Sequence, residues 1–297
     1  MNHLKLRPER LIFASTAHSA GTHAHQRAPH ARGSSDEHLP YLEAGEGLPV
    51  LLVHGWPTSS FLWRGVIPYI AEHRRVLAID LPGFGESSKP VDRDYSFAFF
   101  RSVLDGFAAA VGLESFGLAV HDMGGPVALN WASSRPESVE RLAILNTIVY
   151  PEFSLAVRAF LAAARVPGVG RVLSSRAGLA GAMRFGTVRS DCMTDEALEG
   201  TCAPFAHREA REALIRSVQH LGADGLRPVA AWMRGISVPV RVVYGTRDWI
   251  LPAMPYTVRR LQEEVADIEV TALDDCSHFL QEDRPDRVGE LLAAFFR

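Results

Sequence analysis

The sequence predicts an α/β protein with a mostly parallel, doubly wound sheet and an inserted helical segment. Over residues 39–149, short apolar runs alternate with stretches of helical periodicity. Residues 150–235 offer helical periods but no convincing strand, and the alternation resumes over residues 236–297. Because such alternation is typical of parallel sheets, residues 39–149 and 236–297 are expected to build one core. Residues 150–235 are expected to form a helical cap between two of its strands.

The expected strands are short runs of apolar and β-branched residues. The first run, at 50–53, is apolar throughout, which is typical of a strand buried on both faces of a parallel sheet. The runs of this kind are 50–53, 76–79, 118–120, 142–148, 238–244 and 268–273. The helices expected around them follow helical apolar spacing, at 61–70, 97–111, 126–134, 153–164, 208–221, 258–265 and 287–296.

Residues 1–38 show no pattern that could build a core. The stretch 16–36 is rich in His, Ala, Gly and Ser and contains His18, His23, His25 and His30. This composition predicts a disordered or irregular N-terminal extension. A metal-binding tract is the alternative, because two of the histidines stand close together, but no Cys or carboxylate cluster accompanies them. No metal is therefore predicted.

Composition excludes several classes of protein. With 47% hydrophobic residues and a formal net charge of -3, the chain can bury a large core and has no bias toward nucleic acid. The three cysteines lack Cys-x-x-Cys spacing, which favours a reducing compartment over a disulfide framework or a zinc site. The apolar runs fall short of the ~18 residues that span a bilayer, and no secretory signal is apparent. We therefore expect a cytoplasmic protein without a membrane partner, either a monomer or a weak homodimer.

One motif joins an expected strand to an expected helix by a sharp turn. The sequence Val120-His121-Asp122-Met123-Gly124 places an aspartate where a nucleophile elbow carries its nucleophile, with a glycine two residues later. A carboxylate held there, in front of a helix N-terminus, could attack an sp³ carbon. The alternative is that Asp122 only caps the following helix.

Two further polar residues follow later strands. Asp248 lies just after the run 238–244, in Gly245-Thr246-Arg247-Asp248, and His278 follows the strand at 268–273. A histidine titrates near neutrality and can act as a general base, while a carboxylate can fix its tautomer. A lone loop histidine is often structural, so the hypothesis depends on both residues lying at strand ends together with Asp122.

Other candidate groups fit less well. Ser115 stands at the start of a strand and lacks the small residue before it, so it is expected at the surface. The turn 83–87 is too short for a phosphate loop and lacks its Gly-Lys-Ser/Thr ending. Glu152 and Asp275 are rival acids by sequence proximity alone and rank below Asp248.

Together these residues resemble the α/β-hydrolase superfamily, over roughly residues 39–297. Within it the chain is similar to the aspartate-nucleophile branch of haloalkane dehalogenases and epoxide hydrolases, and most similar to the dehalogenases. The resemblance is carried by His54-Gly55-Trp56-Pro57-Thr58-Ser59-Ser60-Phe61-Leu62-Trp63-Arg64, by Ser277-His278-Phe279-Leu280-Gln281-Glu282-Asp283, and by the chain order of nucleophile, acid and base.

The resemblance implies the α/β-hydrolase fold and a cofactor-free enzyme. Asp122 would form an ester with the substrate carbon, and His278, paired with Asp248, would activate the water that hydrolyses it. The backbone amides of Trp56 and Met123 would form the oxyanion hole. The alternative is that the chain is not an enzyme but a ligand-binding protein of the same fold, with no turnover.

The resemblance leaves halide and epoxide chemistry open. Dehalogenases usually hold the leaving halide between indole N–H groups, one of them on the residue after the nucleophile, which here is Met123. Trp56 could supply one indole. Epoxide hydrolases protonate the opening ring with cap tyrosines, and residues 151–235 contain none. Because a leaving halide needs no proton, dehalogenation is the first prediction and epoxide hydrolysis the second.

The expected substrate site lies between core and cap. Trp56, Tyr150, Phe153 and Phe205 are predicted to contact the substrate or its leaving group. The apolar cap residues Phe153, Phe160, Met183, Phe185 and Phe205 are expected to roof an apolar pocket, most of them as ordinary packing. The partners predicted are therefore water and a small, apolar, uncharged organic substrate.

Overall fold

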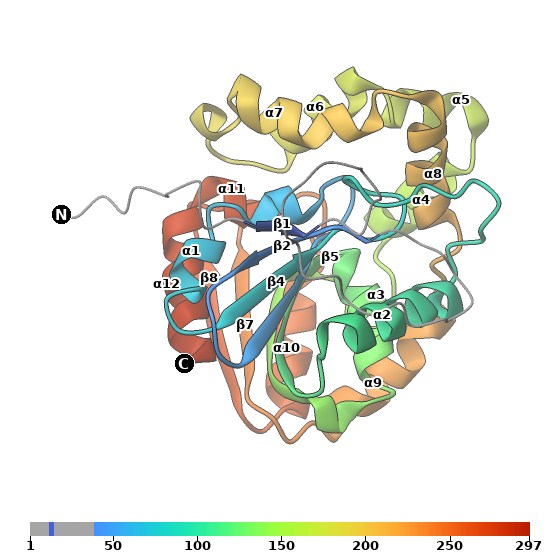
Figure 1. Cartoon of the computed structure of the whole chain (residues 1–297). Helices are drawn as coiled ribbons and strands as arrows, with labels where there is room; N and C mark the ends of the chain where they lie inside the picture. The colour runs from blue at the N-terminus through green and yellow to red at the C-terminus, as the bar shows by residue number, and fades with distance from the viewer. Residues whose placement is uncertain (1–11, 15–38) are drawn as a thin grey trace.

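The computed structural model describes residues 12–14 and 39–297. Within these residues eight strands form one sheet in the order β1-β2-β4-β3-β5-β6-β7-β8 (Figure 1). Strand β2 pairs antiparallel with β1 and β4, and the six strands from β4 to β8 in that order pair in parallel. The bounds are β1 Ile12–Ala14, β2 Tyr41–Ala44, β3 Pro49–Val53, β4 Arg75–Ile79, β5 Phe116–Asp122, β6 Val139–Thr147, β7 Val240–Gly245 and β8 Ile268–Leu273. The predicted α/β class with a mostly parallel sheet is confirmed.

Both faces of the sheet are buried. In β3, Leu51 and Val53 join one apolar core cluster, whereas Val50 and Leu52 join another, because successive side chains of a strand point to opposite faces. The helices on the first face are α2 (Phe97–Val111), α3 (Gly124–Ala132) and α10 (Met254–Glu264), and those on the second are α1 (Ile67–Ile70) and α12 (Pro285–Phe296) (Figure 1). This double burial explains why the strands are apolar throughout.

Residues 12–14 depart from the prediction of an irregular N-terminal extension. They form strand β1, which pairs with β2 at the edge of the sheet. A run of three residues, Ile-Phe-Ala, is too short to show periodicity, so the sequence carried no signal for this strand. The predictions for the rest of residues 1–38, including the four histidines, lie outside the described residues.

The segment between β6 and β7 contains helices and no strand in the described part of the chain. Its α-helices are α4 (Leu155–Ala164), α5 (Pro167–Leu173), α6 (Arg176–Phe185), α7 (Asp195–Cys202), α8 (Arg208–Gln219) and α9 (Arg227–Arg234). Helices α5 to α8 lie beyond one end of the sheet, whereas α9 lies beside α10 at the opposite end (Figure 1). We use "cap" for α4 to α8 and the loops between them.

Helix α9 departs from the predicted extent of the cap. It buries Val229, Ala230 and Met233 in the core cluster of the first sheet face, and it contacts α3 and α10. An amphipathic pattern shows that a helix covers an apolar surface but not which one. The sequence alone therefore assigned α9 to the cap, although it packs on the core.

Among the described residues, no helix is both long and apolar enough to cross a membrane.

Candidate active site

Asp122 occupies a strained turn between β5 and α3. Its φ is 47°, in the left-handed region that residues other than glycine seldom adopt. A Cβ at Gly55 would lie 2.4 Å from the Asp122 side chain, and one at Gly124 would lie 2.3 Å from the His54 carbonyl oxygen. The loop after β3 and this turn therefore pass too close together for a side chain at either glycine.

The carboxylate of Asp122 faces three groups from separate elements. The Trp56 backbone N–H donates to its Oδ1 at 2.7 Å, and the Met123 backbone N–H donates to the same carboxylate. His278 Nε2 lies 3.3 Å from Oδ2. The structure thus brings together the nucleophile and both amides predicted for the oxyanion hole. Asp122 does not cap α3, whose cap position is Met123 without a side-chain hydrogen bond.

Asp122 is ionised despite its burial. Burial raises the pKa of this carboxyl, but the hydrogen bond and the positive charge of His278 outweigh burial and hold the pKa below its ordinary value. An ionised carboxylate beside an apolar space is a competent nucleophile toward carbon.

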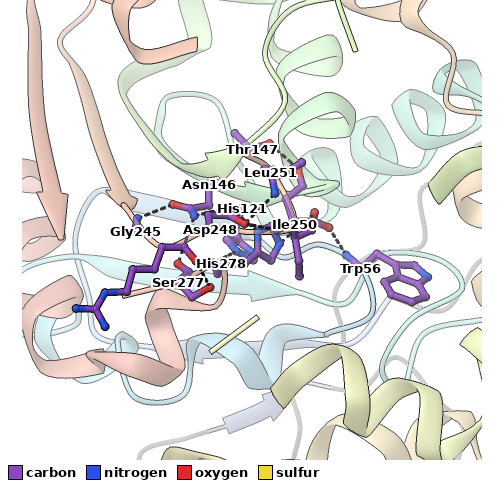
Figure 2. A network of polar contacts seen from close by, with 12 residues as sticks. Trp56, His121, Asn146, Thr147, Gly245, Asp248, Ile250, Leu251, Ser277 and His278 are labelled. Carbon is purple, nitrogen blue, oxygen red and sulfur yellow. Dashed lines mark hydrogen bonds and ion pairs between the residues drawn. The ribbon is translucent and has the colours of Figure 1, made fainter. Parts of the chain in front are cut away.

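His278 is held by Asp248, as Figure 2 shows. Its Nδ1–H donates to Asp248 Oδ2 at 2.9 Å, and its side chain is completely buried. Asp248 Oδ1 also accepts the backbone N–H groups of Ile250 and Leu251, both at 2.8 Å. Burial lowers the pKa of His278, but the charges of Asp248 and Asp122 outweigh it and raise the pKa to about 10. In the resting site His278 is therefore an imidazolium between two carboxylates.

Asn146 completes this network and was not predicted. Its Nδ2 donates to Asp248 Oδ2 at 2.6 Å, and its Oδ1 accepts the Gly245 N–H at 3.0 Å (Figure 2). The signal was a polar residue at the carboxyl end of the otherwise apolar run 142–148, where parallel strands place their functional groups. Asn146 fixes Asp248 against the end of β7.

His121 is a second unpredicted member of the site. Its Nε2–H donates to the His278 carbonyl oxygen at 2.9 Å, and the two rings lie 4.9 Å apart. Burial is the main cause that lowers the pKa of His121, to about 4. His121 is thus a neutral histidine that supports the backbone of His278.

We expect His121→Gln to weaken the acid sensitivity of folding. A folded pKa of about 4 against the ordinary 6.5 means that His121 contributes stability that is fully present above pH 6.5 and lost as the pH falls toward 4. The loss amounts to about 3 kcal/mol. Glutamine keeps a donor for the His278 carbonyl but does not titrate. Urea unfolding at pH 7 and pH 4.5 would measure the difference, and an unchanged pH slope in the variant would contradict this role.

Two buried groups support the loop after β3, which carries the Trp56 amide. His54 Nδ1–H donates to the Gly55 carbonyl oxygen at 3.0 Å, and its Nε2 accepts the Leu81 N–H at 3.1 Å. Asp80 accepts the N–H groups of Ser60 and Glu86, at 2.7 and 2.8 Å. The turn 83–87 is thereby tied to the loop, which agrees with a structural turn rather than a phosphate loop.

The rival groups lie away from this network. Ser115 is exposed and donates to Glu140. Glu152 pairs with Arg260 at 3.0 Å, and Asp275 pairs with Arg284. None of the three contacts Asp122 or His278.

An apolar cavity of about 330 Å³ opens onto Asp122. Its walls come from both core and cap, and Asp122 is the one ionisable residue among those that line it in the described structure. The aromatic lining residues are Trp56, Phe97, Phe153, Phe160, Phe185, Trp249 and Phe279. Phe160 and Phe185 of the cap, and Phe153 two residues before α4, thus line the cavity, as predicted. The walls suit an apolar, uncharged molecule.

Three predicted pocket residues lie elsewhere. The Tyr150 hydroxyl donates to Glu264 of α10 at 2.9 Å, and its ring lies under the Arg260 guanidinium. Phe205 is buried in the core cluster of the first sheet face, and Met183 is buried against Leu62 and Phe279. The predictions of a substrate contact for Tyr150 and Phe205 are wrong, because the sequence indicates a buried residue but not whether a cavity or another element covers it. Met183 is ordinary packing, as expected for most of the apolar cap residues.

Comparison with known proteins gives the family. The model of the α/β-hydrolase fold family matches residues 49–180. A haloalkane dehalogenase of Sphingobium indicum is 30% identical over 87% of this chain and 92% of its own length. One of Agrobacterium fabrum is 29% identical over 86% of each chain. A soluble epoxide hydrolase of Corynebacterium sp. is 28% identical over 87% of this chain and 93% of its own.

The similar solved structures include haloalkane dehalogenases, in agreement with the sequence relatives. The crystal structure of a haloalkane dehalogenase from Bradyrhizobium elkani has a TM-score of 0.78 and 27% identity, covering 90% of this chain and 96% of that one. Fold and comparisons together define an enzyme of the α/β-hydrolase class. Within that class the chain belongs to the family of haloalkane dehalogenase-like hydrolases.

Proposed function

We propose that this enzyme hydrolyses the carbon–halogen bond of small, apolar, uncharged molecules through an alkyl ester on Asp122. The observation that carries the proposal is the position of the Asp122 carboxylate, in the wall of an apolar cavity with His278 Nε2 3.3 Å from its Oδ2. A carboxylate so placed is suited to attack carbon, and the histidine beside it is suited to the second step.

In the first step an oxygen of Asp122 forms a bond to the substrate carbon. The carbon–halogen bond breaks, and its electron pair leaves with the halide. This displacement needs no proton transfer, because halide is a stable anion. The Trp56 N–H, which donates to Oδ1 at 2.7 Å, orients the carboxylate for the attack.

In the second step water hydrolyses the ester. His278 takes a proton from water, and the resulting oxygen attacks the carboxyl carbon of Asp122. The negative charge that develops on the carboxyl oxygen is held by the backbone amides of Trp56 and Met123. The intermediate collapses and releases the alcohol, whose oxygen receives the proton from His278. The hydroxyl proton left on the Asp122 carboxyl then passes to His278, which restores the carboxylate and the imidazolium.

Ester formation itself prepares His278 for this role. In the resting site the Asp122 carboxylate is one of the groups that raise the pKa of His278 to about 10. An ester carries no charge, so esterification removes that contribution while the opposing effect of burial remains. The pKa of His278 therefore falls when the ester forms, and loss of its proton to solvent leaves the neutral base in the intermediate.

The donors around the cavity favour halide over epoxide. No tyrosine lines the cavity in the described part of the chain, so an opening oxirane would have no hydroxyl acid beside it. The side-chain N–H donors among the lining residues are the indoles of Trp56 and Trp249. The Trp56 indole extends away from Asp248 and His278 (Figure 2), and its Nε1 is buried with no hydrogen-bond partner among the described residues. A halide needs only such weak donors, whereas an alkoxide needs a proton.

Epoxide hydrolysis is the second candidate, supported by the epoxide hydrolase among the relatives. The intermediate would then be a hydroxyalkyl ester on the same aspartate. A ligand-binding role without turnover is less well supported, because His278 lies within 3.3 Å of Asp122 and within 2.9 Å of Asp248.

Substrate panels distinguish these functions. We expect halide release from neutral bromo- and chloroalkanes, no diol from terminal or aryl epoxides, and turnover of charged haloacids at least about tenfold slower, because the cavity offers no partner for a carboxylate. Halide is measured by ion chromatography and diol by gas chromatography. Diol formation without halide release would show that the enzyme hydrolyses epoxides and not carbon–halogen bonds. Saturable binding with no product from either panel would favour the binding protein.

A further inference from the structure

The loop that carries His278 is bonded directly to the cap. The Phe279 N–H, one residue after the base, donates to the Gly186 carbonyl oxygen at 2.8 Å. Asp283 Oδ1 accepts the backbone N–H groups of Val188 and Arg189, at 2.8 and 3.0 Å. Residues 186–189, which follow α6, are called the cap segment below. It is held at both ends by residues 277–283, the segment that contains His278.

Asp283 also holds the residue before the base. Its second oxygen, Oδ2, accepts the Ser277 N–H at 2.8 Å. The Asp283 side chain is completely buried, at the end of the short helix α11 (Leu280–Asp283). Burial raises the pKa of this carboxyl above its ordinary value, and the hydrogen bonds from three backbone donors oppose that effect only in part. One carboxylate thus joins two amides of the cap segment to the amide next to His278.

The cap segment also touches the cavity wall. A Cβ on Gly186 would lie 2.5 Å from the Phe279 ring, so the segment rests directly on that ring. The Phe279 ring lies edge-on to the His278 ring, with centroids 4.8 Å apart. Phe185 and Phe279 both line the cavity. Any molecule that fills the cavity therefore contacts residues on both sides of the bond between cap and base loop.

We propose that Asp283 is a positioning residue, which couples the seating of the cap to the placement of His278 Nε2 against the ester on Asp122. The proposal rests on the proposed function, because it concerns the hydrolysis of that ester. If the cap segment and Ser277 are tied by one carboxylate, loss of the tie lets the His278 loop shift without removing the base or the nucleophile. The first step, which uses only Asp122, should be little affected.

The neighbouring carboxylate provides a matched control. Glu282 forms a bidentate ion pair with Arg64, at 2.6 and 2.7 Å, and is also buried in the same helical turn. Its partner belongs to the loop after β3 and not to the cap. Glu282→Gln should therefore cost stability without loosening the cap segment.

The experiment compares Asp283→Asn with Glu282→Gln by rapid-quench kinetics on a bromoalkane. Halide release reports the first step, and the mass of the quenched protein reports loss of the ester. In Asp283→Asn we expect ester hydrolysis to slow by about 10- to 100-fold, as for a misplaced catalytic group, with halide release within about threefold of wild type. The Glu282→Gln variant should keep the wild-type ratio of the two steps. Equal slowing of both steps in Asp283→Asn, or no slowing, would overturn the proposal.

Amide hydrogen exchange in the unmodified protein supplies a test that needs neither activity nor a folded variant. We expect the amides of Ser277, Val188 and Arg189 to exchange through one shared opening, with similar protection. Protection of Ser277 that is at least about 100-fold greater than that of Val188 and Arg189 would show that the two loops open separately, and would overturn the coupling. Absence of turnover in the wild type would instead count against the proposed function, and the exchange result would still decide the coupling.

Discussion

Replacing Asp122 by Asn should abolish turnover, with a loss of at least about 10⁴-fold in kcat. An amide does not displace halide from carbon, so neither the ester nor the alcohol can form. Asparagine tolerates a positive φ better than most residues, which suits the φ of 47° at this turn. The variant should therefore fold, and halide release per enzyme should stay below one equivalent over hours. Intact mass before the assay checks that the amide has not reverted to the acid.

Asp275→Asn is the matched control for this variant. Asp275 is a partly exposed carboxylate three residues before His278. It pairs with Arg284 rather than with Asp122, Asp248 or His278. We expect its turnover to remain within about twofold of wild type, as for most surface substitutions. If Asp122→Asn kept more than about 1% of the wild-type turnover rate while Asp275→Asn lost its turnover, the assignment of the nucleophile would be wrong.

Replacing His278 by Gln should stop turnover after one event. The first step needs no base, so the variant should release one equivalent of halide per active site. The second step loses the group that takes the proton from water, and the steady-state rate should fall by about 10⁴-fold. Stopped-flow or chromatographic halide measurement would show a burst followed by a plateau. Continued release at a rate near that of the wild type would show that His278 is not the base.

The fold and the positions of three site residues were predictable from local signals. The apolar run 50–53 indicated a doubly buried strand because β3 is covered on both faces. Asp122, Asp248 and His278 each follow a parallel strand, and the carboxyl ends of such strands meet at one edge of the sheet. The structure therefore brings together three residues that are far apart in the chain.

The supporting contacts were not predictable, because they depend on long-range geometry. Tyr150 stands at the start of the cap, yet its hydroxyl is taken by Glu264 of α10. Nothing in the sequence near His121 indicates that its ring supports the backbone of His278. Asp283 likewise binds Val188 and Arg189 across roughly a third of the chain. A single sequence shows which residue types are present at strand ends, but not which buried polar groups become partners.

Peptide mapping of the His278→Gln variant after reaction with a bromoalkane tests the central claim most directly. If the carboxylate of Asp122 attacks carbon and His278 serves only the second step, the peptide that contains Asp122 will gain the mass of the alkyl group. Fragmentation will place that group on Asp122, and the same peptide from the wild type under the same conditions will be unmodified. For a substrate that the wild type hydrolyses, an unmodified Asp122 peptide in the variant, or an adduct on another residue, would contradict the account.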